Sequence, residues 1–205
     1  MFTTRRLSVM CILGLLAVAL RPTADAQTVR GVVIDPPVSL PSFTLTDHNG
    51  EAFGVEQLTG RWSKVMIGFT QCPDVCPFTL MNLEAVRAEL GLRVRPDHLP
   101  HIIFLAVDPE RNRPILKDYV GHFHADYIGI TGEPQQIDTL VTGLDAFYRL
   151  EKKHPNDQAY DVKHSAAVAI LNPKAEIVAK ISPPFHPHRT ADYLFKVMKG
   201  VQLEN

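Results

Sequence analysis

The sequence predicts an α/β fold, with a central mixed β-sheet flanked by helices and followed by a C-terminal β-hairpin and helix. Short apolar runs typical of buried strands alternate with helical patterns through most of the chain. The most apolar run, residues 101–107, is typical of a central parallel strand. Near the end, residues 166–171 and 176–181 flank an Asn-Pro-Lys turn, which predicts the hairpin.

The first 26 residues have the features of an export signal. Arg5 and Arg6 precede an apolar run over 7–20, and Ala-Asp-Ala at 24–26 offers a cleavage site. A run of 14 apolar residues is short for a membrane span, which needs about 20. We therefore expect a cleaved signal and an exported protein, periplasmic or at the outer face of the inner membrane. Retention of this segment as an anchor, with proximity to the membrane, is the alternative.

The rest of the chain is predicted to form one domain. Residues 27–41 are expected to be an extended, proline-containing lead-in, and residues 42–205 the domain itself. Without residues 1–26 the formal net charge falls from −1 to about −3, which gives no reason to expect a nucleic-acid partner. Only two of the three cysteines, Cys72 and Cys76, lie outside the signal.

The elements follow from periodicity and from turn residues. A strand over 42–46 is closed by Asp-His-Asn-Gly at 47–50, and leucine and valine spacing predicts a helix over 77–90 that ends at Gly91. The other expected strands are 64–69, 101–107 and 127–130, and the other expected helices are 113–123, 135–147 and 190–199. The expected core or near-core aromatic residues are Trp62, Phe69, Phe78, Phe104 and Tyr119.

The segment with the clearest chemistry is Cys72-Pro-Asp-Val-Cys76, which lies between the strand at 64–69 and the helix at 77–90. Unpaired backbone N–H groups at a helix start favour negative charge, so this placement favours thiolates. Thiolate is both the metal ligand and the nucleophile. Cysteines four positions apart on a helix share one face, so the pair can bind one ion or form a disulfide after a small adjustment. A purely structural disulfide is disfavoured because it would close a very short loop.

Residues 68–77, Gly-Phe-Thr-Gln-Cys-Pro-Asp-Val-Cys-Pro, resemble the copper-site motif of the Sco/SenC family. Two further blocks agree in order and spacing, Val-Asp-Pro-Glu-Arg at 107–111 and Val-Lys-His-Ser-Ala at 162–166. The resemblance implies a thioredoxin-like domain that binds copper, Cu(I) or Cu(II), through Cys72, Cys76 and His164. It also implies a metallochaperone, rather than an enzyme, that helps to assemble the binuclear copper centre of cytochrome c oxidase. Copper delivery, thiol chemistry or both would serve that assembly. The implied partners are a copper-accepting oxidase subunit and a thiol reductant or copper donor protein.

The position of His164 supports its assignment as a ligand. In thioredoxin-like reductases a proline directly before the first strand of the last hairpin faces the cysteine pair, and His164-Ser165 takes that place here. Two thiolates and an imidazole suit Cu(I), but the same three ligands could hold zinc with one open position. The choice of copper over zinc therefore depends on the resemblance.

Two acidic residues are candidates for roles around the site. Asp74 is either a weak extra ligand or a surface acid, and Asp108 either orients His164 or a partner or ends a strand. The family block Asp-Pro-x-Arg-Asp-Thr-Pro reads Asp-Pro-Glu-Arg-Asn-Arg-Pro at 108–114, so an acid and a hydroxyl are missing.

The alternative function is an exported thiol–disulfide oxidoreductase of thioredoxin type. In such a protein one cysteine attacks a disulfide of the partner and the other resolves the mixed disulfide. His164 is a poor substitute for the missing proline, which favours the copper-binding hypothesis. A peroxide-reducing function is disfavoured because Thr70 stands two positions before Cys72, whereas a Thr-x-x-Cys site needs three.

Overall fold

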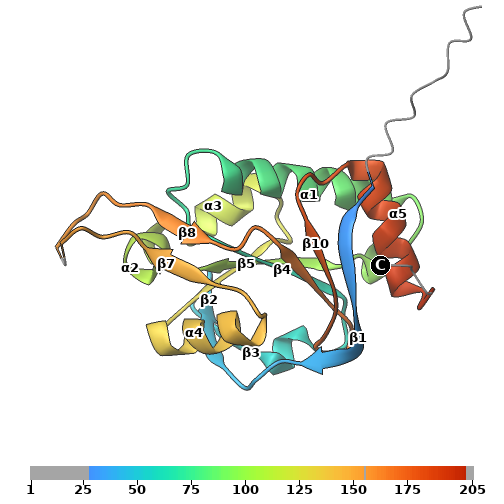
Figure 1. The fold of residues 1–205 in the computed structure, drawn as a ribbon, viewed down its shortest axis with the longest axis horizontal. Coiled ribbons are helices and arrows are strands. Elements are labelled where there is room, and N and C mark those ends of the chain that lie inside the picture. The colour runs from blue at the N-terminus through green and yellow to red at the C-terminus, as the bar shows by residue number, and fades with distance from the viewer. Residues whose placement is uncertain (1–27, 155, 202–205) are drawn as a thin grey trace, which may run out of the picture.

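The protein is built on a mixed eight-stranded sheet with strand order β1-β10-β9-β4-β5-β6-β2-β3 (Figure 1). The computed structural model describes residues 28–154 and 156–201, so the expected export signal lies outside the described residues. Within the sheet β4, β5 and β6 run parallel, and the remaining pairings are antiparallel. The strands are β1 (Arg30–Ser39), β2 (Thr44–Asp47), β3 (Ala52–Gly54), β4 (Ser63–Gly68), β5 (His101–Ala106), β6 (Ile128–Thr131), β9 (Val168–Leu171) and β10 (Glu176–Ser182).

Helices cover both faces of this sheet. Figure 1 shows α1, α3 and α5 on one side and α4 on the other. The helices are α1 (Val75–Gly91), α2 (Pro109–Asn112), α3 (Leu116–Phe123), α4 (Pro134–Gly143) and α5 (Pro187–Met198), with short 3-10 turns η1 (Val55–Leu58), η2 (Pro96–His98) and η3 (Arg113–Ile115). None of the helices in the described part of the chain is both long enough and apolar enough to cross a bilayer.

The sequence-based prediction of the fold class is confirmed, and most elements lie within a few residues of their expected bounds. The run at 101–107 is indeed a central parallel strand, β5. Helix α4 ends at Gly143, earlier than expected, and Asp145 just beyond it has a left-handed φ of 47°, which a continuing helix does not allow. The expected lead-in contains β1, which pairs with β10 as an edge strand. Its two prolines, Pro36 and Pro37, lie at a register shift where they interrupt no regular ladder.

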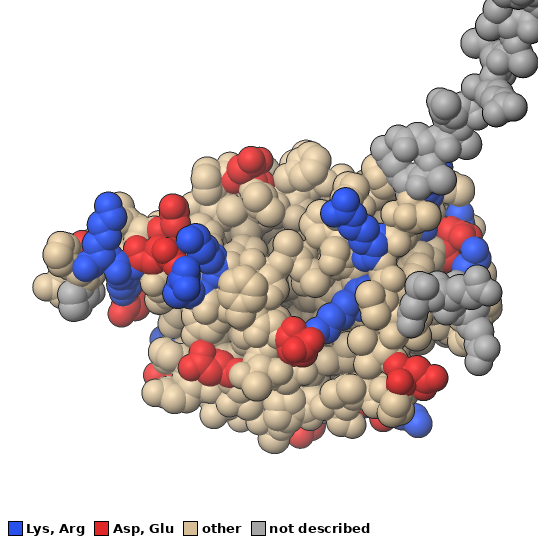
Figure 2. All heavy atoms as spheres, in the orientation of Figure 1, with Lys and Arg blue, Asp and Glu red and all other residues tan. Residues whose placement is uncertain are grey.

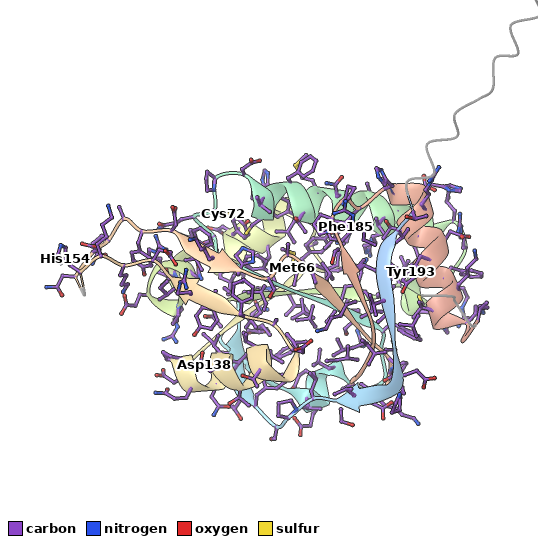
Figure 3. All side chains as sticks on the ribbon, in the orientation of Figure 1. Met66, Cys72, Asp138, His154, Phe185 and Tyr193 are labelled. Atoms are coloured by element: carbon purple, nitrogen blue, oxygen red, sulfur yellow. The ribbon has the colours of Figure 1, made fainter. Side chains whose placement is uncertain are left out.

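A second, two-stranded sheet was not predicted. Strands β7 (Tyr148–Leu150) and β8 (Val162–His164) pair antiparallel with each other and not with the main sheet. Residues 148–154 and 156–164, here called the hairpin arm, project from the body of the molecule, with His154 near the tip (Figure 3). Strands of three residues carry too little alternation to be detected in a sequence.

The core fills the space between the sheet and its helices. Leu80, Leu83 and Val86 of α1 are fully buried, as the helical spacing predicted. Phe104 and Phe69 are also buried, but Phe78 is 63% exposed, so its assignment to the core was wrong. The fully buried residues repeat at 80, 83, 86 and 90. Phe78 lies off that stripe because side chains three and four apart share a face.

Candidate metal centre

The two cysteines lie where β4 passes into α1. The backbone N–H of Cys76, at the second position of the helix, donates a hydrogen bond to the Sγ of Cys72 at 3.3 Å. Asp74 occupies the N-cap position but its side chain makes no capping bond. The first N–H groups of a helix have no partner within the helix, so the sulfur of Cys72 takes the capping role. Asp74 itself is exposed, as expected of a surface acid.

Close packing beneath the cysteines depends on a glycine in β4. A Cβ atom at Gly68 would lie 2.6 Å from the Phe104 ring and 3.1 Å from the Sγ of Cys76. The first distance is shorter than van der Waals contact allows, and the phenylalanine is itself buried. The absence of a side chain at this position therefore lets the sulfur of Cys76 lie against the end of the sheet.

The environment of Cys76 differs from the expected activation by the helix start. The residue is fully buried, and this burial raises the pKa of the Cys76 thiol to about 12. A helix N-terminus contributes on the order of 1 kcal/mol, which is less than the desolvation of a thiolate costs here. Cys76 is therefore a neutral thiol at physiological pH until a bound cation or a partner replaces its proton.

His164 ends strand β8 and meets Cys76 across the fold. Its Nε2 lies 3.5 Å from the Sγ of Cys76. Its Nδ1 lies 2.9 Å from the backbone oxygen of Ser165, which can only accept a hydrogen bond, so Nδ1 carries the proton. The lone pair of Nε2 therefore faces the sulfur. A carbonyl that fixes the tautomer in this way is typical of histidines that bind metals.

Cys76 contacts both Cys72 and His164, but the three predicted ligands do not form a closed site. Among residues 28–154 and 156–201, no three His, Cys, Asp or Glu side chains are grouped closely enough to hold a metal ion. Both cysteines are free thiols, and Cys72 is partly exposed.

Residues from the next strand end hold the cysteine turn. Asn112 is fully buried, and its Oδ1 accepts hydrogen bonds from both the N–H and the hydroxyl of Thr70, each at 2.8 Å. This asparagine is one of the two positions where the chain departs from the family block. Its amide oxygen accepts both bonds from Thr70, as a carboxylate oxygen at this position could. Its Nδ2 is buried without a hydrogen-bond partner.

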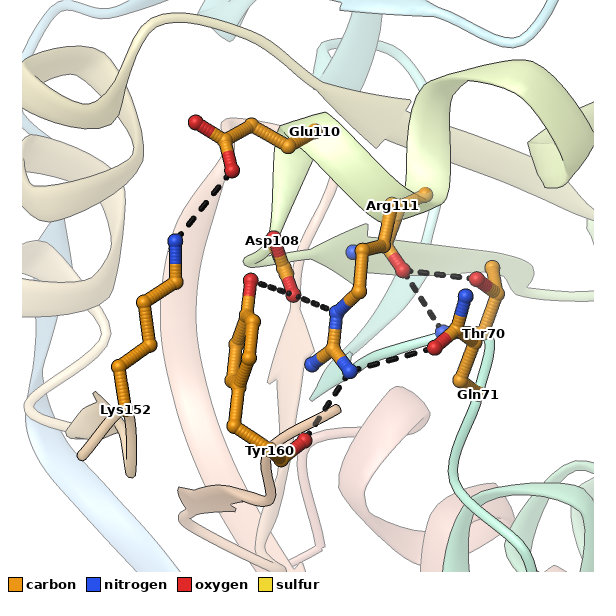
Figure 4. A network of polar contacts seen from close by, with 8 residues as sticks. Thr70, Gln71, Asp108, Glu110, Arg111, Lys152 and Tyr160 are labelled. Atoms are coloured by element: carbon orange, nitrogen blue, oxygen red, sulfur yellow. Dashed lines mark hydrogen bonds and ion pairs between the residues drawn. The ribbon is translucent and has the colours of Figure 1, made fainter. Parts of the chain in front are cut away.

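Asp108 does not contact His164. Its carboxylate accepts hydrogen bonds from Arg111 Nε and from the hydroxyl of Tyr160, the latter at 2.8 Å (Figure 4). The idea that it orients His164 directly is therefore wrong. Tyr160 was not predicted, because nothing in the local pattern connects position 160, within an irregular segment, to the site. Arg111 was part of the quoted block at 107–111, but no role was predicted for it.

Further groups near the cysteines were not predicted to belong to the surroundings of the site. The hydroxyl of Tyr119 is buried without a partner, and burial together with both cysteines raises its pKa above the ordinary value. On the outer side, Val75, Phe78 and Met81 are exposed along α1 next to the cysteine pair. Figure 2 shows Lys, Arg, Asp and Glu side chains gathered on the hairpin arm, which carries His164.

A mixed sheet with a Cys-x-x-x-Cys pair at the start of its first long helix defines a thioredoxin-like protein. The family model described as SCO1/SenC matches residues 34–199. An SCO2-like protein of Rickettsia felis is 33% identical over 153 residues, covering 74% of this chain and 73% of that protein. The chain belongs to the SCO1/SenC family.

Solved structures agree with this membership. Arabidopsis thaliana ScoI, crystallised with copper bound, superposes with a TM-score of 0.71 at 27% identity, covering 78% of this chain and 98% of that one. Yeast Sco1 with copper bound gives a TM-score of 0.71 at 25% identity, covering 80% and 90% of the two chains. Human mitochondrial SCO1 homolog is 30% identical over 162 residues, covering 72% of this chain and 53% of that protein.

Proposed function

We propose that this protein binds one copper ion as cargo through Cys72, Cys76 and His164 and serves as an assembly factor for the copper centre of cytochrome c oxidase. The observation that carries the proposal is the 3.5 Å approach of His164 Nε2 to the Sγ of Cys76. Copper-bound structures of relatives in Arabidopsis and yeast support the choice of metal.

The chemistry of the donor atoms fits copper. Two thiolates with one imidazole are soft ligands, which suit Cu(I), and imidazole also binds Cu(II). Cys76 lies in an apolar environment that keeps its thiol neutral, so copper binding would release its proton and supply the missing positive charge. Zinc could use the same ligands, so competition between the two metals is part of the test.

We further propose that the protein is exported and meets its partners outside the cytoplasm. The amino-terminal sequence carries the charge and hydrophobic pattern of an export signal. The exposed apolar side chains Val75, Phe78 and Met81 lie beside the cysteines on α1. Such a surface suits transient contact with a copper-accepting oxidase subunit, a copper donor or a thiol reductant.

The test is a copper titration of the reduced protein, followed through the visible sulfur-to-copper charge-transfer bands of Cu(II). We expect one equivalent to bind, and we expect His164→Ala to weaken Cu(II) binding more than about 10-fold and to change the bands. His154→Ala is the matched control, because His154 is exposed at the tip of the same hairpin arm (Figure 3). Identical spectra for wild type and His164→Ala would reject the three-residue site.

A second candidate function is thiol–disulfide exchange, which the unequal exposure of the two cysteines favours. Cys72 is partly exposed and Cys76 buried, as attacking and resolving thiols often are. The Cys72 thiolate would attack a partner disulfide and expel one partner thiolate. Cys76 would then attack the Cys72 sulfur, expelling the second thiolate and leaving a Cys72–Cys76 disulfide, with two electrons and two protons lost by the pair. Catalytic insulin reduction with dithiothreitol, dependent on Cys72 but not on His164, would support this function.

A further inference from the structure

The hairpin arm that carries His164 is tied to the body by a buried carboxylate. Asp108, the N-cap residue of α2 just beyond β5, is 1% exposed. It accepts hydrogen bonds from Arg111 Nε of α2 and from the hydroxyl of Tyr160 on the arm (Figure 4). A buried carboxylate needs such donors, because an unpaired buried charge is costly. The arm therefore supplies one of the bonds that make the burial of Asp108 tolerable.

The same arginine also reaches the cysteine turn. Its Nη1 lies 3.2 Å from Oε1 of Gln71, the residue before Cys72, and 3.0 Å from the backbone oxygen of Tyr160. A planar guanidinium can donate in several fixed directions at once, which a lysine cannot do. Arg111 thus bonds to both segments that bring proposed ligands to the site.

A series of ring contacts follows the same path. The Cζ of Arg111 lies 3.6 Å from the centre of the Tyr160 ring and 5.5 Å from that of Phe69. Phe69 in turn meets His164 edge to face, with ring centres 6.5 Å apart and an interplanar angle of 80°. Contacts therefore run from Tyr160 through Arg111 and Phe69 to the imidazole, in addition to the backbone between Tyr160 and His164.

The arm has no sheet pairing to fix its direction. Strands β7 and β8 bond only to each other within the described sheets. Beside the arm lies an open hollow of about 960 Å³, lined in part by Gln71, Arg111 and Tyr160. Beyond the backbone bonds at its base, side-chain contacts with the body therefore help to determine where His164 points.

We infer that Arg111 and Tyr160 are positioning residues, which seat the hairpin arm so that Nε2 of His164 faces Cys76. They act through the arm and through Phe69 and do not themselves bind the metal. The inference rests on the proposed copper site and adds a condition to it. The contribution of His164 to metal binding depends on bonds made by residues 53 and four positions away in the sequence.

The first test uses the reduced, metal-free protein. In wild type we expect the Nδ1–H of His164 to exchange slowly with solvent, observed by nitrogen-15 NMR of the imidazole, because it donates to Ser165. Tyr160→Ala removes the hydroxyl and the ring and should speed this exchange by at least 10-fold. Arg111→Lys keeps a positive charge but loses the planar donors, so it should act in the same direction. Thermal unfolding checks that each variant is folded.

Two further variants make the test specific. Tyr160→Phe retains the ring beneath the guanidinium. It should therefore speed the exchange of the His164 Nδ1–H less than Tyr160→Ala does. Lys152→Ala is the matched control on the arm. Lys152 contacts Glu110 at 3.3 Å and the Tyr160 ring at 4.7 Å, but its loss leaves the Asp108 bonds intact. We expect wild-type exchange in this control.

The second test repeats the copper titration with the same variants. Tyr160→Ala and Arg111→Lys should lower Cu(II) affinity about 10-fold and weaken the nitrogen hyperfine coupling of the imidazole in the EPR spectrum. If His164→Ala changes the copper spectrum but Tyr160→Ala leaves both the spectrum and the ring exchange as in wild type, the positioning role is refuted and the copper site stands. If His164→Ala changes nothing, the copper site fails, and the metal-free ring exchange alone decides the positioning role.

Discussion

The Nε2 of His164 lies 3.5 Å from the Sγ of Cys76, although 88 positions separate the two residues in the chain. One partner sits at the start of α1 and the other at the end of a three-residue strand outside the main sheet. The Ser165 carbonyl orients the ring, and Gly68 makes room for the sulfur. The proposed metal site thus depends on backbone features as much as on its ligands.

The two thiols should differ in reactivity. Cys72 is partly exposed, while Cys76 is fully buried with its pKa raised to about 12 by burial. We expect iodoacetamide to modify Cys72 first at neutral pH and Cys76 much more slowly, because the thiolate is the reacting form. Mass spectrometry of Cys72→Ser and Cys76→Ser separates the two rates. Equal rates for the two single variants would mean that Cys76 is not buried as described.

Gly68→Ala should destabilise the fold by overpacking the region beneath the cysteines. The new Cβ would meet Phe104 at 2.6 Å and the Sγ of Cys76 at 3.1 Å, and overpacking of this kind costs about 1–3 kcal/mol. Gly121→Ala is the matched control, because Gly121 lies in helix α3 and a Cβ added there would meet nothing within 4 Å. That control should gain about 0.5–1 kcal/mol. Urea unfolding measures both changes, and a neutral Gly68→Ala would contradict the packing.

Lys64 should make stability rise with pH. The side chain is buried on β4 with no partner for its Nζ, and burial lowers its pKa from 10.5 to about 7. Glu84 on α1 raises this pKa and Arg87 lowers it, but both effects are smaller than that of burial. Between about pH 7 and pH 10.5, Lys64 is protonated in the unfolded chain and neutral in the folded chain. The destabilisation by Lys64 is therefore complete below about pH 7 and disappears as the pH rises towards 10.5.

The Lys64→Met variant isolates this effect. At 1.36 kcal/mol per pKa unit, the shift from 10.5 to about 7 means that the folded protein loses on the order of 5 kcal/mol at low pH. We expect Lys64→Met to be more stable than wild type at pH 6 and the difference to shrink by pH 10. The free energy of unfolding in urea at several pH values measures it. Taking the difference between the two proteins removes the opposite contribution of Cys76, whose raised pKa destabilises the fold above pH 9. A constant difference across the range would mean that Lys64 keeps its proton.

Local patterns in the sequence predicted the parts of this fold that depend on burial. Strands β4 and β5 and helix α1 bury continuous apolar runs or stripes, and these appear directly in the sequence. The hairpin arm could not be predicted, because three-residue strands have no usable period. Strand β1 was predicted only as an extended lead-in, because its two prolines argue against a strand. An edge strand tolerates them.

The residues of the site likewise divide into those that local sequence patterns predict and those that they do not. Cys72 and Cys76 are close in the chain, and their chemistry is visible in one motif. His164 was predicted as a ligand from its position before the last hairpin and from the family resemblance. The role of Tyr160 could not be found, because its bond to Asp108 joins segments that no local pattern connects. Arg111 appeared only as part of the family block, with no role of its own.

The most direct test of the proposed centre is copper K-edge X-ray absorption of the Cu(I)-loaded protein. We expect two sulfur neighbours and one nitrogen neighbour, with the nitrogen lost in His164→Ala and retained in His154→Ala. A spectrum of wild type with sulfur neighbours alone, or one that His164→Ala leaves unchanged, would contradict the proposed centre.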